Sequence, residues 1–499
     1  MRVFVWLVVL AMLSGVAAGQ VQCCVDGCCG PDGSCIYEPN WASLDQRPTP
    51  KWWVDAKFGI FVDWGLCSVP AWSVRGEYAE WYWNRVERDK SKDGPWWRFH
   101  KETYGEDFEY KDFAPMFKGE LFDPDEWAEL FERSGAKYVV LISKHHDGYC
   151  LWPSEEANKT WGRAWNSVDV GPGRDVVGEL TEAVRKTDLR MGIYYSLYEW
   201  FNPLWLSDRD RYVAEHMIPQ FKDLVTRYEP MVIFSDGEWD MDSSRWRSEE
   251  LLDWLFNDSP VGSYVVINDR WGKDCRHKHG GYYTTEYGAG LKGGSHPWEE
   301  NRGMAYSYGY SRTETLSDYK SGRELVLMLV DMVSRGGNLL LDIGPAADGR
   351  IPVIMEERLI QIGTWLEVNG EAIYSSWPWR KTIQWTEGKM PEVGYDKQYK
   401  AKYDIKELTG KPAWGKAVID AFFTCKGDTL YAITPRWPKE SFVVREVSTS
   451  VNTAVTLLGH DKPLQWEASD GDVVIDVPRL SPDELPCEYA YVFEITEVE

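Results

Sequence analysis

Asp236 and Glu286 are the two carboxylates in the sequence that are best placed for catalysis. Each lies at the end of a β-rich run, Asp236 directly after 231–235 and Glu286 at the end of 282–286. A single Asp in such a position could equally cap the loop or helix that follows, so the interpretation depends on its companions. Two neighbouring carboxylates surrounded by aromatic rings are what cleavage of a glycosidic bond requires. One attacks the anomeric carbon and the other protonates the leaving oxygen.

Other predicted strand ends carry polar side chains as well. His145 and His146 follow the run 138–143, and Arg270 follows the run 264–268. Adjacent histidines on an extended chain point in opposite directions, which makes them a poor ligand pair for one metal ion. A bend at the strand end would let both reach a substrate, so we predict hydrogen bonds to sugar hydroxyls rather than a metal site. Arg270 could bind a hydroxyl or hold a carboxylate in place. Loops could hold these groups for stability alone, but so many polar strand ends exceed that need.

The elements that would position these side chains alternate along the chain. The predicted strands are 57–62, 138–143, 191–196, 231–235, 264–268, 282–286, 305–309 and 338–343. The predicted helices are 124–134, 176–186, 209–227, 247–256 and 322–334. Several strands are continuous apolar runs, which is typical of strands buried on both faces. The first helix has a complete start signal, with Asp123 as N-cap, Pro124 at the first position and Glu126 at the third.

This order predicts an α/β fold, a (β/α)8-like TIM barrel. Between 268 and 282 there is room for a loop but hardly for a helix, so either the sixth unit is irregular or the strand count is wrong by one. A doubly wound open sheet is the alternative, but no Gly-rich phosphate-binding turn opens a helix after a strand. After about residue 375 the pattern changes to short alternating segments, which predict a small C-terminal antiparallel β-sandwich. These segments are 417–423, 429–433, 472–477 and 489–495.

The N-terminus predicts entry into the secretory pathway. Arg2 precedes an apolar run over 3–13, and small residues follow it, which is the layout of a cleavable signal peptide over 1–19. The run is too short to span a membrane, and no other stretch approaches the ~20 apolar residues of a span. We therefore expect a lysosomal or extracellular protein without a membrane span. The sequons at Asn158 and Asn257 fit this compartment.

Residues 20–44 form a Cys-rich segment, which we expect to be ordered by disulfides because it is too poor in apolar residues to bury a core. A small metal-binding knot is the weaker interpretation. The segment contains Cys23, Cys24, Cys28, Cys29 and Cys35, and five further cysteines are scattered along the chain. The predicted catalytic domain follows over 45–375 and the β-sandwich domain over 376–499.

Charge and composition narrow the class of ligand. The formal net charge of −24 argues against nucleic acid or an anionic membrane as partner, because both would repel the protein. The chain contains 28 Trp and 27 Tyr, more than a core of this size needs. Flat rings with a polar edge suit the C–H faces of sugars, although extra packing explains some of them.

Seven motifs, taken together, resemble those of the α-L-fucosidases of glycoside hydrolase family 29. The resemblance runs in order from about Trp52 to Trp379 and implies a (β/α)8-like barrel, a C-terminal β-sandwich, a retaining mechanism, and neither cofactor nor metal. It also implies fucosylated glycans or glycoconjugates as partners and leaves a homo-oligomer open. The motifs are Lys57-Phe-Gly-Ile-Phe61 with Trp64-Gly65, Ser68-Val-Pro-Ala-Trp72, Glu80-Trp-Tyr-Trp-Asn84, Lys144-His-His-Asp-Gly148, Tyr194-Tyr-Ser196, Ser235-Asp-Gly-Glu-Trp239 and Asn268-Asp-Arg-Trp-Gly272.

Site residues follow from the resemblance motif by motif. Asp236 resembles the family nucleophile. Glu286 is the expected acid/base, with Glu299 as the second candidate, while Glu238 is too close to Asp236 in sequence to act from the opposite face. The implied substrate contacts are Glu80, His145, His146, Tyr194, Phe234, Arg270 and Tyr308.

Asp63 is the one clear departure from the family pattern. It stands before Trp64-Gly65, where the family has a His that binds a sugar hydroxyl. We expect Asp63 to line the sugar subsite and to add negative charge there, which would tend to raise the pKa values of its neighbours. Two other functions stay open at this point, a catalytically silent fucose-binding lectin and a hydrolase for a different sugar.

Overall fold

Eight parallel strands form one curled sheet in the computed structural model, which describes residues 36–291, 296–391, 394–395, 401–402 and 404–498. Their order in the sheet is β5-β4-β3-β2-β1-β8-β7-β6. The strands are β1 Phe58–Val62, β2 Tyr138–Lys144, β3 Arg190–Ser196, β4 Val232–Asp236, β5 Val266–Ile267, β6 Tyr283–Glu286, β7 Trp298–Gly303 and β8 Gly337–Ile343. The predicted (β/α)8-like barrel is confirmed.

The two edge strands, β5 and β6, meet through backbone hydrogen bonds outside the regular ladder. Tyr282 N donates to Ile267 O (3.1 Å) and Gly281 N donates to Asn268 O (3.2 Å). A Cβ atom on Gly281 would lie 1.9 Å from Ile267 O, so only glycine permits this approach. The unit between β5 and β6 is irregular, as its length predicted: β5 has two residues, and a loop replaces the helix.

The barrel interior is filled by large side chains. β1, β2 and β8 are buried at every position, in keeping with their continuous apolar runs. Phe61, Tyr194 and Phe234 belong to one core cluster inside the barrel, with Phe61 and Phe234 ring centroids 5.1 Å apart. Each such aromatic side chain stabilises the fold by roughly 1.5–3 kcal/mol through its burial. The interior is therefore a packed core that supports whatever lies above it.

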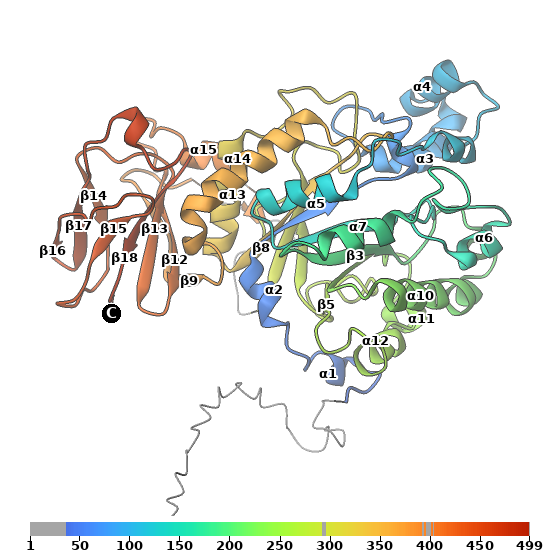
Figure 1. Ribbon diagram of the computed structural model, residues 1–499, viewed down its shortest axis with the longest axis horizontal. Coiled ribbons are helices and arrows are strands. Elements are labelled where there is room, and N and C mark those ends of the chain that lie inside the picture. Colours follow the sequence, from blue (N-terminus) through green and yellow to red (C-terminus); the bar gives the residue numbers. More distant parts are fainter. Residues whose placement is uncertain (1–35, 292–295, 392–393, 396–400, 403, 499) are drawn as a thin grey trace, which may run out of the picture.

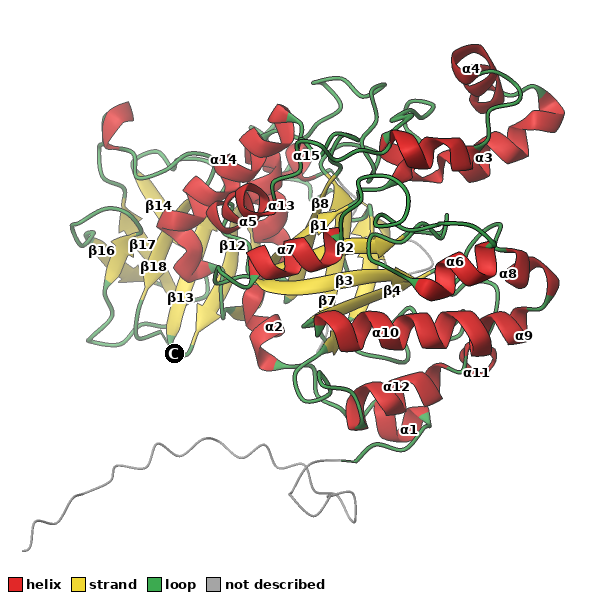
Figure 2. Cartoon of the chain, turned by 45° about the vertical axis from the view of Figure 1, so that its right-hand side comes forward, coloured by secondary structure: helices red, strands yellow, loops and turns green. Residues whose placement is uncertain are grey.

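Helices surround the sheet, as Figures 1 and 2 show. They are α1 Trp41–Leu44, α2 Lys51–Ala56, α3 Tyr82–Asp89, α4 Pro95–Tyr104, α5 Pro124–Arg133, α6 Glu155–Trp161, α7 Val176–Val184, α8 Pro203–Ser207, α9 Arg209–Tyr212, α10 Ile218–Tyr228, α11 Ser243–Trp246, α12 Ser248–Asn257, α13 Gly322–Ser334, α14 Val353–Asn369 and α15 Ile405–Thr409. The predicted cap of α5 is confirmed, since Asp123 Oδ1 accepts hydrogen bonds from the backbone N–H groups of Asp125 (3.0 Å) and Glu126 (3.1 Å).

The helix predicted over 209–227 is divided into three parts. α9 and α10 are separated by one wider turn over Val213–Met217. Pro219, near the start of α10, has no N–H to donate to the preceding turn, and a wider turn accommodates this loss.

The strand predicted over 305–309 is wrong. The seventh strand is β7, which ends at Gly303, and 305–309 is the loop after it. The sequence of β7 is Trp-Glu-Glu-Asn-Arg-Gly, and its Glu299, Glu300 and Asn301 are buried although they are polar. A search for apolar runs therefore passes over β7.

Strands from Trp377 onward form two antiparallel sheets, which lie at the left of Figure 1. The order is β15-β18-β13-β12-β9 in one and β14-β17-β16 in the other. Their bounds are β9 Trp377–Trp385, β12 Ile419–Lys426, β13 Thr429–Thr434, β14 Ser441–Val444, β15 Val455–Leu457, β16 Trp466–Ser469, β17 Asp472–Asp476 and β18 Tyr491–Ile495, and a short pair is formed by β10 Gly394–Tyr395 and β11 Ala401–Lys402. Both sheets contribute to one core, in which the rings of Phe442 and Phe493 are 5.1 Å apart. The predicted β-sandwich is confirmed.

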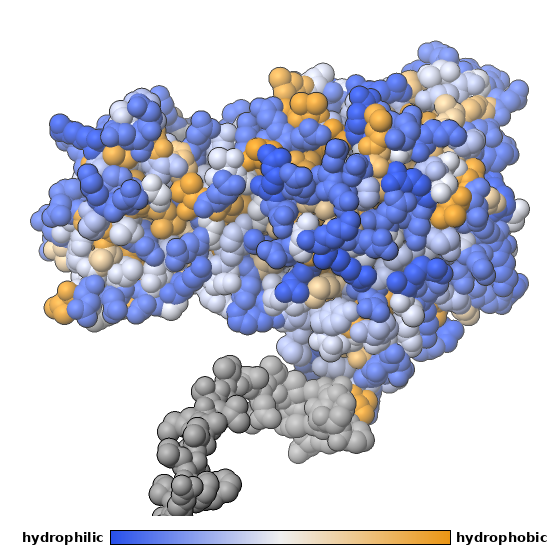
Figure 3. All heavy atoms as spheres, in the orientation of Figure 1, coloured by the Kyte–Doolittle hydropathy of each residue, from blue (hydrophilic) through white to orange (hydrophobic). Residues whose placement is uncertain are grey.

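The expected signal peptide and the predicted disulfides of the Cys-rich segment fall on residues 1–35, outside the described residues. The five described cysteines, Cys67, Cys150, Cys275, Cys425 and Cys487, are free thiols. Within the described ranges, no helix has both the length and the apolar character to cross a bilayer. The face in Figure 3 is hydrophilic over most of its area, and hydrophobic residues occur there in small groups.

Candidate active site

A cavity of about 490 Å³ opens at the carboxyl ends of the barrel strands. In barrels of this kind, that end carries the catalytic groups. All ten side chains predicted for the site line this one cavity. They are Asp63, Glu80, His145, His146, Tyr194, Phe234, Asp236, Arg270, Glu286 and Tyr308.

Asp236 is the last residue of β4, and hydrogen-bond donors hold both oxygens of its carboxylate. Arg270 Nη1 donates to Oδ1 (2.8 Å), and Tyr194 Oη donates to Oδ2 (2.9 Å). Burial by itself would raise the pKa of Asp236, but the guanidinium of Arg270, aided by His146 and Arg276, holds it well below its usual range. Asp236 is therefore an ionised, oriented carboxylate at the base of the cavity.

Glu286 is the last residue of β6 and shares Arg270 with Asp236. Arg270 Nη2 lies 3.3 Å from Glu286 Oε2, while Arg270 Nε donates to Thr284 Oγ1 (3.0 Å). The Glu286 side chain is 25% exposed, against 10% for Asp236, so solvent reaches Glu286 more readily. Tyr78 Oη is 3.5 Å from Glu286 Oε1. One guanidinium thus brings two carboxylates of different exposure together.

His145 and His146 both face the cavity, because β2 departs from regular pairing at its end. The register between β2 and β3 shifts between Ile142 and Lys144, and the two imidazole rings have centroids 4.1 Å apart. Burial lowers the pKa of His146 to about 4 and lowers that of His145 well below its usual value, so both rings are neutral near pH 7. Neutral imidazoles serve as hydrogen-bonding groups.

The hydrogen bonds of His146 indicate its tautomer. Ser196 Oγ donates to Tyr198 O (2.6 Å), so it accepts from His146 Nδ1 (2.6 Å). With this assignment the proton of the neutral ring is on Nδ1, and Nε2, which lies 3.5 Å from Asp236 Oδ2, can accept a hydrogen bond from a sugar hydroxyl. His145 Nδ1 is buried without a hydrogen-bond partner in the protein, while the ring as a whole lines the cavity.

Asp63, Glu80 and Asp342 form a group of buried carboxyls beside the cavity. Glu80 Oε2 accepts from Gly309 N (3.0 Å) and Ser307 Oγ (3.2 Å), whereas Asp63 Oδ2 and both oxygens of Asp342 are buried without a hydrogen-bond partner. Burial raises the pKa of Glu80 to about 7. Burial, and then the charges of Glu80 and Asp147, raise the pKa of Asp63 well above its usual range.

Several residues that line the cavity were not among the predicted site residues. Phe61 and Ile142 are buried strand residues, and Trp81 and Trp239 lie inside two of the recognised motifs. The residues are Phe61, Tyr78, Trp81, Ile142, Trp239 and Asn301. The rings of Trp81 and Trp239 are stacked at 6.0 Å, and Trp239 is 39% exposed at the rim. Asn301 lies on β7, and the sequence did not predict it because it did not predict that strand.

Arg276 was also missed, because nothing in its surrounding sequence distinguishes it from a solvated loop arginine. It lies between β5 and β6, with Nη2 3.7 Å from Asp236 Oδ1 and Nε donating to Glu238 Oε1 (2.6 Å). Glu238 does not line the cavity. Its carboxylate is bound by Arg276 instead, in agreement with the prediction that it is no partner for Asp236.

Glu299, the second candidate for the acid/base, lies away from the cavity. It is the second residue of β7 and accepts a hydrogen bond from Tyr138, the first residue of β2. It is fully buried, and burial raises its pKa to about 8. A carboxyl at the amino-terminal side of the barrel interior cannot reach a substrate at the opposite end.

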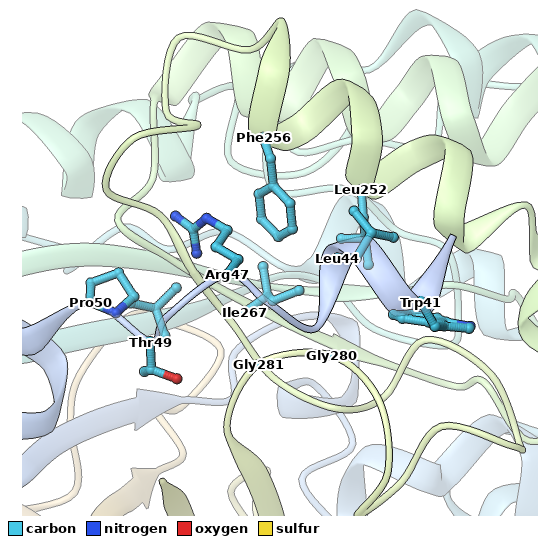
Figure 4. A pocket seen from close by; sticks show the side chains of 11 residues that line it. Trp41, Leu44, Arg47, Thr49, Pro50, Leu252, Phe256, Ile267, Gly280 and Gly281 are labelled. Atoms are coloured by element: carbon cyan, nitrogen blue, oxygen red, sulfur yellow. The ribbon is translucent and has the colours of Figure 1, made fainter. Parts of the chain in front are cut away.

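A second hollow, of about 320 Å³, lies between residues 41–50 and α12 (Figure 4). Arg47 extends toward the ring of Phe256 there, 4.4 Å from its centroid, and donates to Gly262 O (2.9 Å). The residues lining this hollow include neither a carboxylate nor a histidine. Residues 41–50 form one wall of this hollow, and its lining provides no group for acid–base catalysis. In the part of the chain that the structure describes, no group of three or more His, Cys, Asp or Glu is arranged to hold a metal ion.

Comparison with known proteins matches both parts of the chain to one family. The model of the family "Alpha-L-fucosidase" matches residues 29–371, and that of "Alpha-L-fucosidase C-terminal domain" matches residues 417–496. The chain is 41% identical over 474 residues to the tissue alpha-L-fucosidase of Homo sapiens, with 93% of this chain and 92% of the relative covered. It is 42% identical over 475 residues to the plasma alpha-L-fucosidase of Rattus norvegicus, with 93% and 94% covered.

Solved structures show the same similarity in three dimensions. The crystal structure of Thermotoga maritima alpha-fucosidase in complex with a mechanism-based inhibitor superposes with a TM-score of 0.74 at 33% identity. The superposition covers 92% of this chain and 100% of the bacterial one. Fold and sequence therefore agree with these proteins along nearly the whole chain.

Proposed function

Because this chain belongs to the α-L-fucosidases of glycoside hydrolase family 29, enzymes that hydrolyse fucosyl residues, we propose that it removes terminal α-L-fucose by a retaining double displacement. In this proposal Asp236 is the nucleophile and Glu286 is the general acid/base. The substrates are fucosylated glycans or glycoconjugates, and the reaction needs no cofactor.

One observation carries the mechanism: a single guanidinium holds both carboxylates. Arg270 contacts Asp236 Oδ1 at 2.8 Å and Glu286 Oε2 at 3.3 Å from its two terminal nitrogens. Retaining glycosidases need their two carboxyl groups roughly 5–5.5 Å apart, whereas inverting enzymes need room for a water molecule between carboxylate and sugar. A shared guanidinium favours the closer arrangement.

In the first step, a lone pair of the Asp236 carboxylate attacks the anomeric carbon. The bond from that carbon to the glycosidic oxygen breaks, and Glu286 transfers its proton to the departing oxygen. The product is a fucosyl ester of Asp236. Arg270 and Tyr194 hold the carboxylate in position, so little of the entropy cost of orientation is left to the reaction itself.

In the second step, Glu286 removes a proton from water as the water attacks the anomeric carbon and the ester bond to Asp236 breaks. The greater exposure of Glu286 suits this role, because water must reach it. The interactions that hold the pKa of Asp236 well below its usual range also make the carboxylate a good leaving group. Two inversions restore the configuration of the fucoside.

Hydrogen-bonding groups around the cavity would recognise the sugar. His145 and His146 offer imidazole rings, and Glu80 and Asp63 offer carboxyl groups. Phe234 packs beneath Arg270, whose Cζ is 4.8 Å from the Phe234 ring. Uncharged hydrogen-bonding groups next to the aromatic ring of Phe234 are suited to an uncharged deoxy sugar, which has both hydroxyl groups and an apolar methyl group.

A panel of chromogenic glycosides tests the reaction itself. We expect turnover of the aryl α-L-fucoside to exceed that of the aryl β-D-galactoside, α-D-mannoside and β-D-glucoside by at least about a hundredfold, since each added or missing polar contact costs specificity. Proton NMR during the first turnovers should show α-L-fucose before the β anomer. An initial β product would contradict the retaining mechanism. Binding of fucose without any hydrolysis would indicate a lectin instead.

The buried pair of Asp63 and Glu80 gives a pH-dependent prediction. Burial raises the pKa of Glu80 to about 7, while burial and the charges of Glu80 and Asp147 raise the pKa of Asp63 well above its usual range, so Asp63 keeps its proton at pH values where an ordinary Asp is ionised. A protonated Asp63 can donate a hydrogen bond to fucose, in place of the additional negative charge that its residue type suggests. We therefore expect KM for an aryl fucoside to rise as increasing pH deprotonates Asp63, because the hydrogen-bond donor is then lost and a negative charge is added.

Asp63→Asn tests this interpretation, because an amide donates at every pH. KM of the Asn variant should stay nearly level through the range in which the wild-type KM rises. Asp63→Ala should have a KM about fivefold higher at acidic pH, the loss expected for one hydrogen bond. If the Asn variant reproduces the wild-type KM profile, Asp63 does not donate to the sugar.

The compartment and the division of the chain are further parts of the proposal. Two relatives are named tissue and plasma fucosidase, which supports a protein of the secretory pathway that is lysosomal or extracellular. We propose a signal peptide over 1–19, a Cys-rich segment over 20–44, a catalytic domain over 45–375 and a β-sandwich domain over 376–499. A homo-oligomer remains compatible with these domains.

A further inference from the structure

Two hollows adjoin each other beside the sugar cavity, of about 870 and 820 Å³. Both are lined by Tyr287, Arg302 and Lys320, and the larger one is also lined by Tyr78 and Tyr306. We call the surface made by these five residues the outer groove. Tyr78 also lines the sugar cavity, so the outer groove begins where the cavity ends.

The outer groove carries two cations, Arg302 and Lys320, that form no ion pair with a carboxylate of the described residues. Within the described ranges, neither the guanidinium of Arg302 nor Lys320 Nζ lies within 4.0 Å of an Asp or Glu oxygen. The Nε of Arg302 is buried without a hydrogen-bond partner, and Nη1 makes only a long contact to Gly288 O (3.4 Å). Burial, and then the nearby charge of Arg302, lower the pKa of Lys320, and the charges of Asp404 and Glu324 offset part of this effect. An anion bound between Arg302 and Lys320 would relieve the repulsion between their two positive charges, so the pair forms a candidate anion site.

The acidic residues along the two hollows have partners of their own. Glu77 lies 3.6 Å from Arg85, and Asp318 lies 2.6 Å from Arg75. Asp331 lies 2.6 Å from Arg335. Asp404 accepts a hydrogen bond from Lys406 N (2.9 Å) as the N-cap of α15. Three of these four carboxylates are therefore paired with arginines other than Arg302, and only Asp404 offsets part of the charge of Lys320, from beyond 4.0 Å. Arg302 keeps an unpaired positive charge in a protein whose net charge is −24.

The position of the outer groove relates it to the leaving group. A general acid stands on the side of the glycosidic oxygen, and Tyr78 Oη lies 3.5 Å from Glu286 Oε1. The part of a glycan that leaves from Glu286 therefore passes Tyr78. Tyr78 stacks on Tyr287 at 5.6 Å, and Tyr306 is 55% exposed farther along. Exposed tyrosines provide faces on which further sugar rings can stack.

We propose that the outer groove is a subsite for glycans that carry an anionic group on the leaving-group side of fucose, with Arg302 and Lys320 binding the anion. The anion is a carboxylate or a sulfate ester, as found on sialylated or sulfated sugars. A carboxylate group is planar and a sulfate group is tetrahedral, and each has oxygens that can accept hydrogen bonds from a guanidinium and an ammonium at the same time. This inference rests on the proposed function, because it takes Glu286 as the group that faces the leaving sugar.

The test compares three fucosylated oligosaccharides with the same core: a neutral one, one with a terminal sialic acid, and one with a sulfate ester at the same sugar. For the wild-type enzyme we expect kcat/KM for at least one acidic substrate to exceed that for the neutral one by at least about threefold, mostly through KM. The preference should shrink between about 20 and 300 mM NaCl, because salt screens exposed charges. The acidic substrate that is preferred identifies the source of the anion.

Lys320→Glu should abolish or reverse the preference, whereas Lys320→Arg should keep it. Lys186→Glu is the matched control, since Lys186 is exposed, pairs with Asp125 (2.7 Å), and does not line the groove. It makes the same change in net charge and should keep the preference. Thermal unfolding midpoints within about 3 °C of the wild type will show that the variants are folded.

Three outcomes would overturn the inference: no preference for either acidic substrate, a preference that survives in Lys320→Glu, or an equal loss in Lys186→Glu. A wild-type enzyme that cleaves the aryl fucoside but shows no preference contradicts only the outer groove. An enzyme that cleaves no fucoside at all contradicts the proposed function.

Discussion

Asp236→Gly should lower kcat for an aryl α-L-fucoside by more than about a thousandfold, because no other group can form the covalent intermediate. Arg270 would remain at the base of the cavity and would favour a small anion in the vacated space. Added azide should therefore restore part of the cleavage of an activated fucoside and give β-L-fucosyl azide, the product of a single inversion. Product analysis by NMR, with and without azide, provides the measurement.

The controls for this prediction separate chemistry from folding. Removing one partner of a buried ion pair destabilises a protein by roughly 3–5 kcal/mol, so the thermal midpoint of Asp236→Gly must be measured, and Asp236→Asn gives a second variant of nearly native shape. Glu238→Gln is the matched control: Glu238 is buried, contacts Arg276, and lies outside the cavity. It should retain at least about a tenth of the wild-type kcat. Near-normal turnover of Asp236→Gly without azide would contradict the nucleophile assignment.

Glu286→Ala is expected to slow natural glycans by about a hundredfold or more, but aryl fucosides with acidic phenols by less than about tenfold. A good leaving group departs without a proton, whereas a sugar hydroxyl does not. The measurement is kcat/KM for a series of aryl fucosides of decreasing phenol acidity, together with one fucosylated disaccharide. In the Ala variant the rate should depend steeply on the acidity of the phenol.

Glu299→Gln is the matched control for Glu286→Ala. Its carboxyl is buried at the amino-terminal side of the barrel, where it accepts a hydrogen bond from Tyr138, so its replacement should change stability more than the dependence on the leaving group. Azide should also accelerate the second step of the Glu286→Ala variant, since azide attacks without a general base. If Glu299→Gln shows the leaving-group effect and Glu286→Ala does not, the acid/base has been assigned to the wrong residue.

The sequence by itself was sufficient for the architecture and for ten residues of the site. β-rich runs predicted seven of the barrel strands, and several of these runs are continuously apolar because strands buried on both faces admit few polar residues. Polar residues at strand ends and the family resemblance together predicted ten residues that line one cavity. The strand-end residues meet there because the carboxyl ends of parallel strands lie at one end of a barrel. The start of α5 was also predicted correctly, because an N-cap depends only on residues within one helical turn.

Tertiary structure alone decided the features that depend on neighbours distant in sequence. β7 is polar yet buried, so its place could not be read from an apolar pattern. Arg276 reaches Asp236 across the loop between β5 and β6. The protonation of Asp63 depends on burial and on the charges of Glu80 and Asp147, and the outer groove depends on Arg302 and Lys320 lying together. Hydrophobic periodicity reports whether a residue is buried, but pKa values and unpaired charges depend on which groups surround it in space.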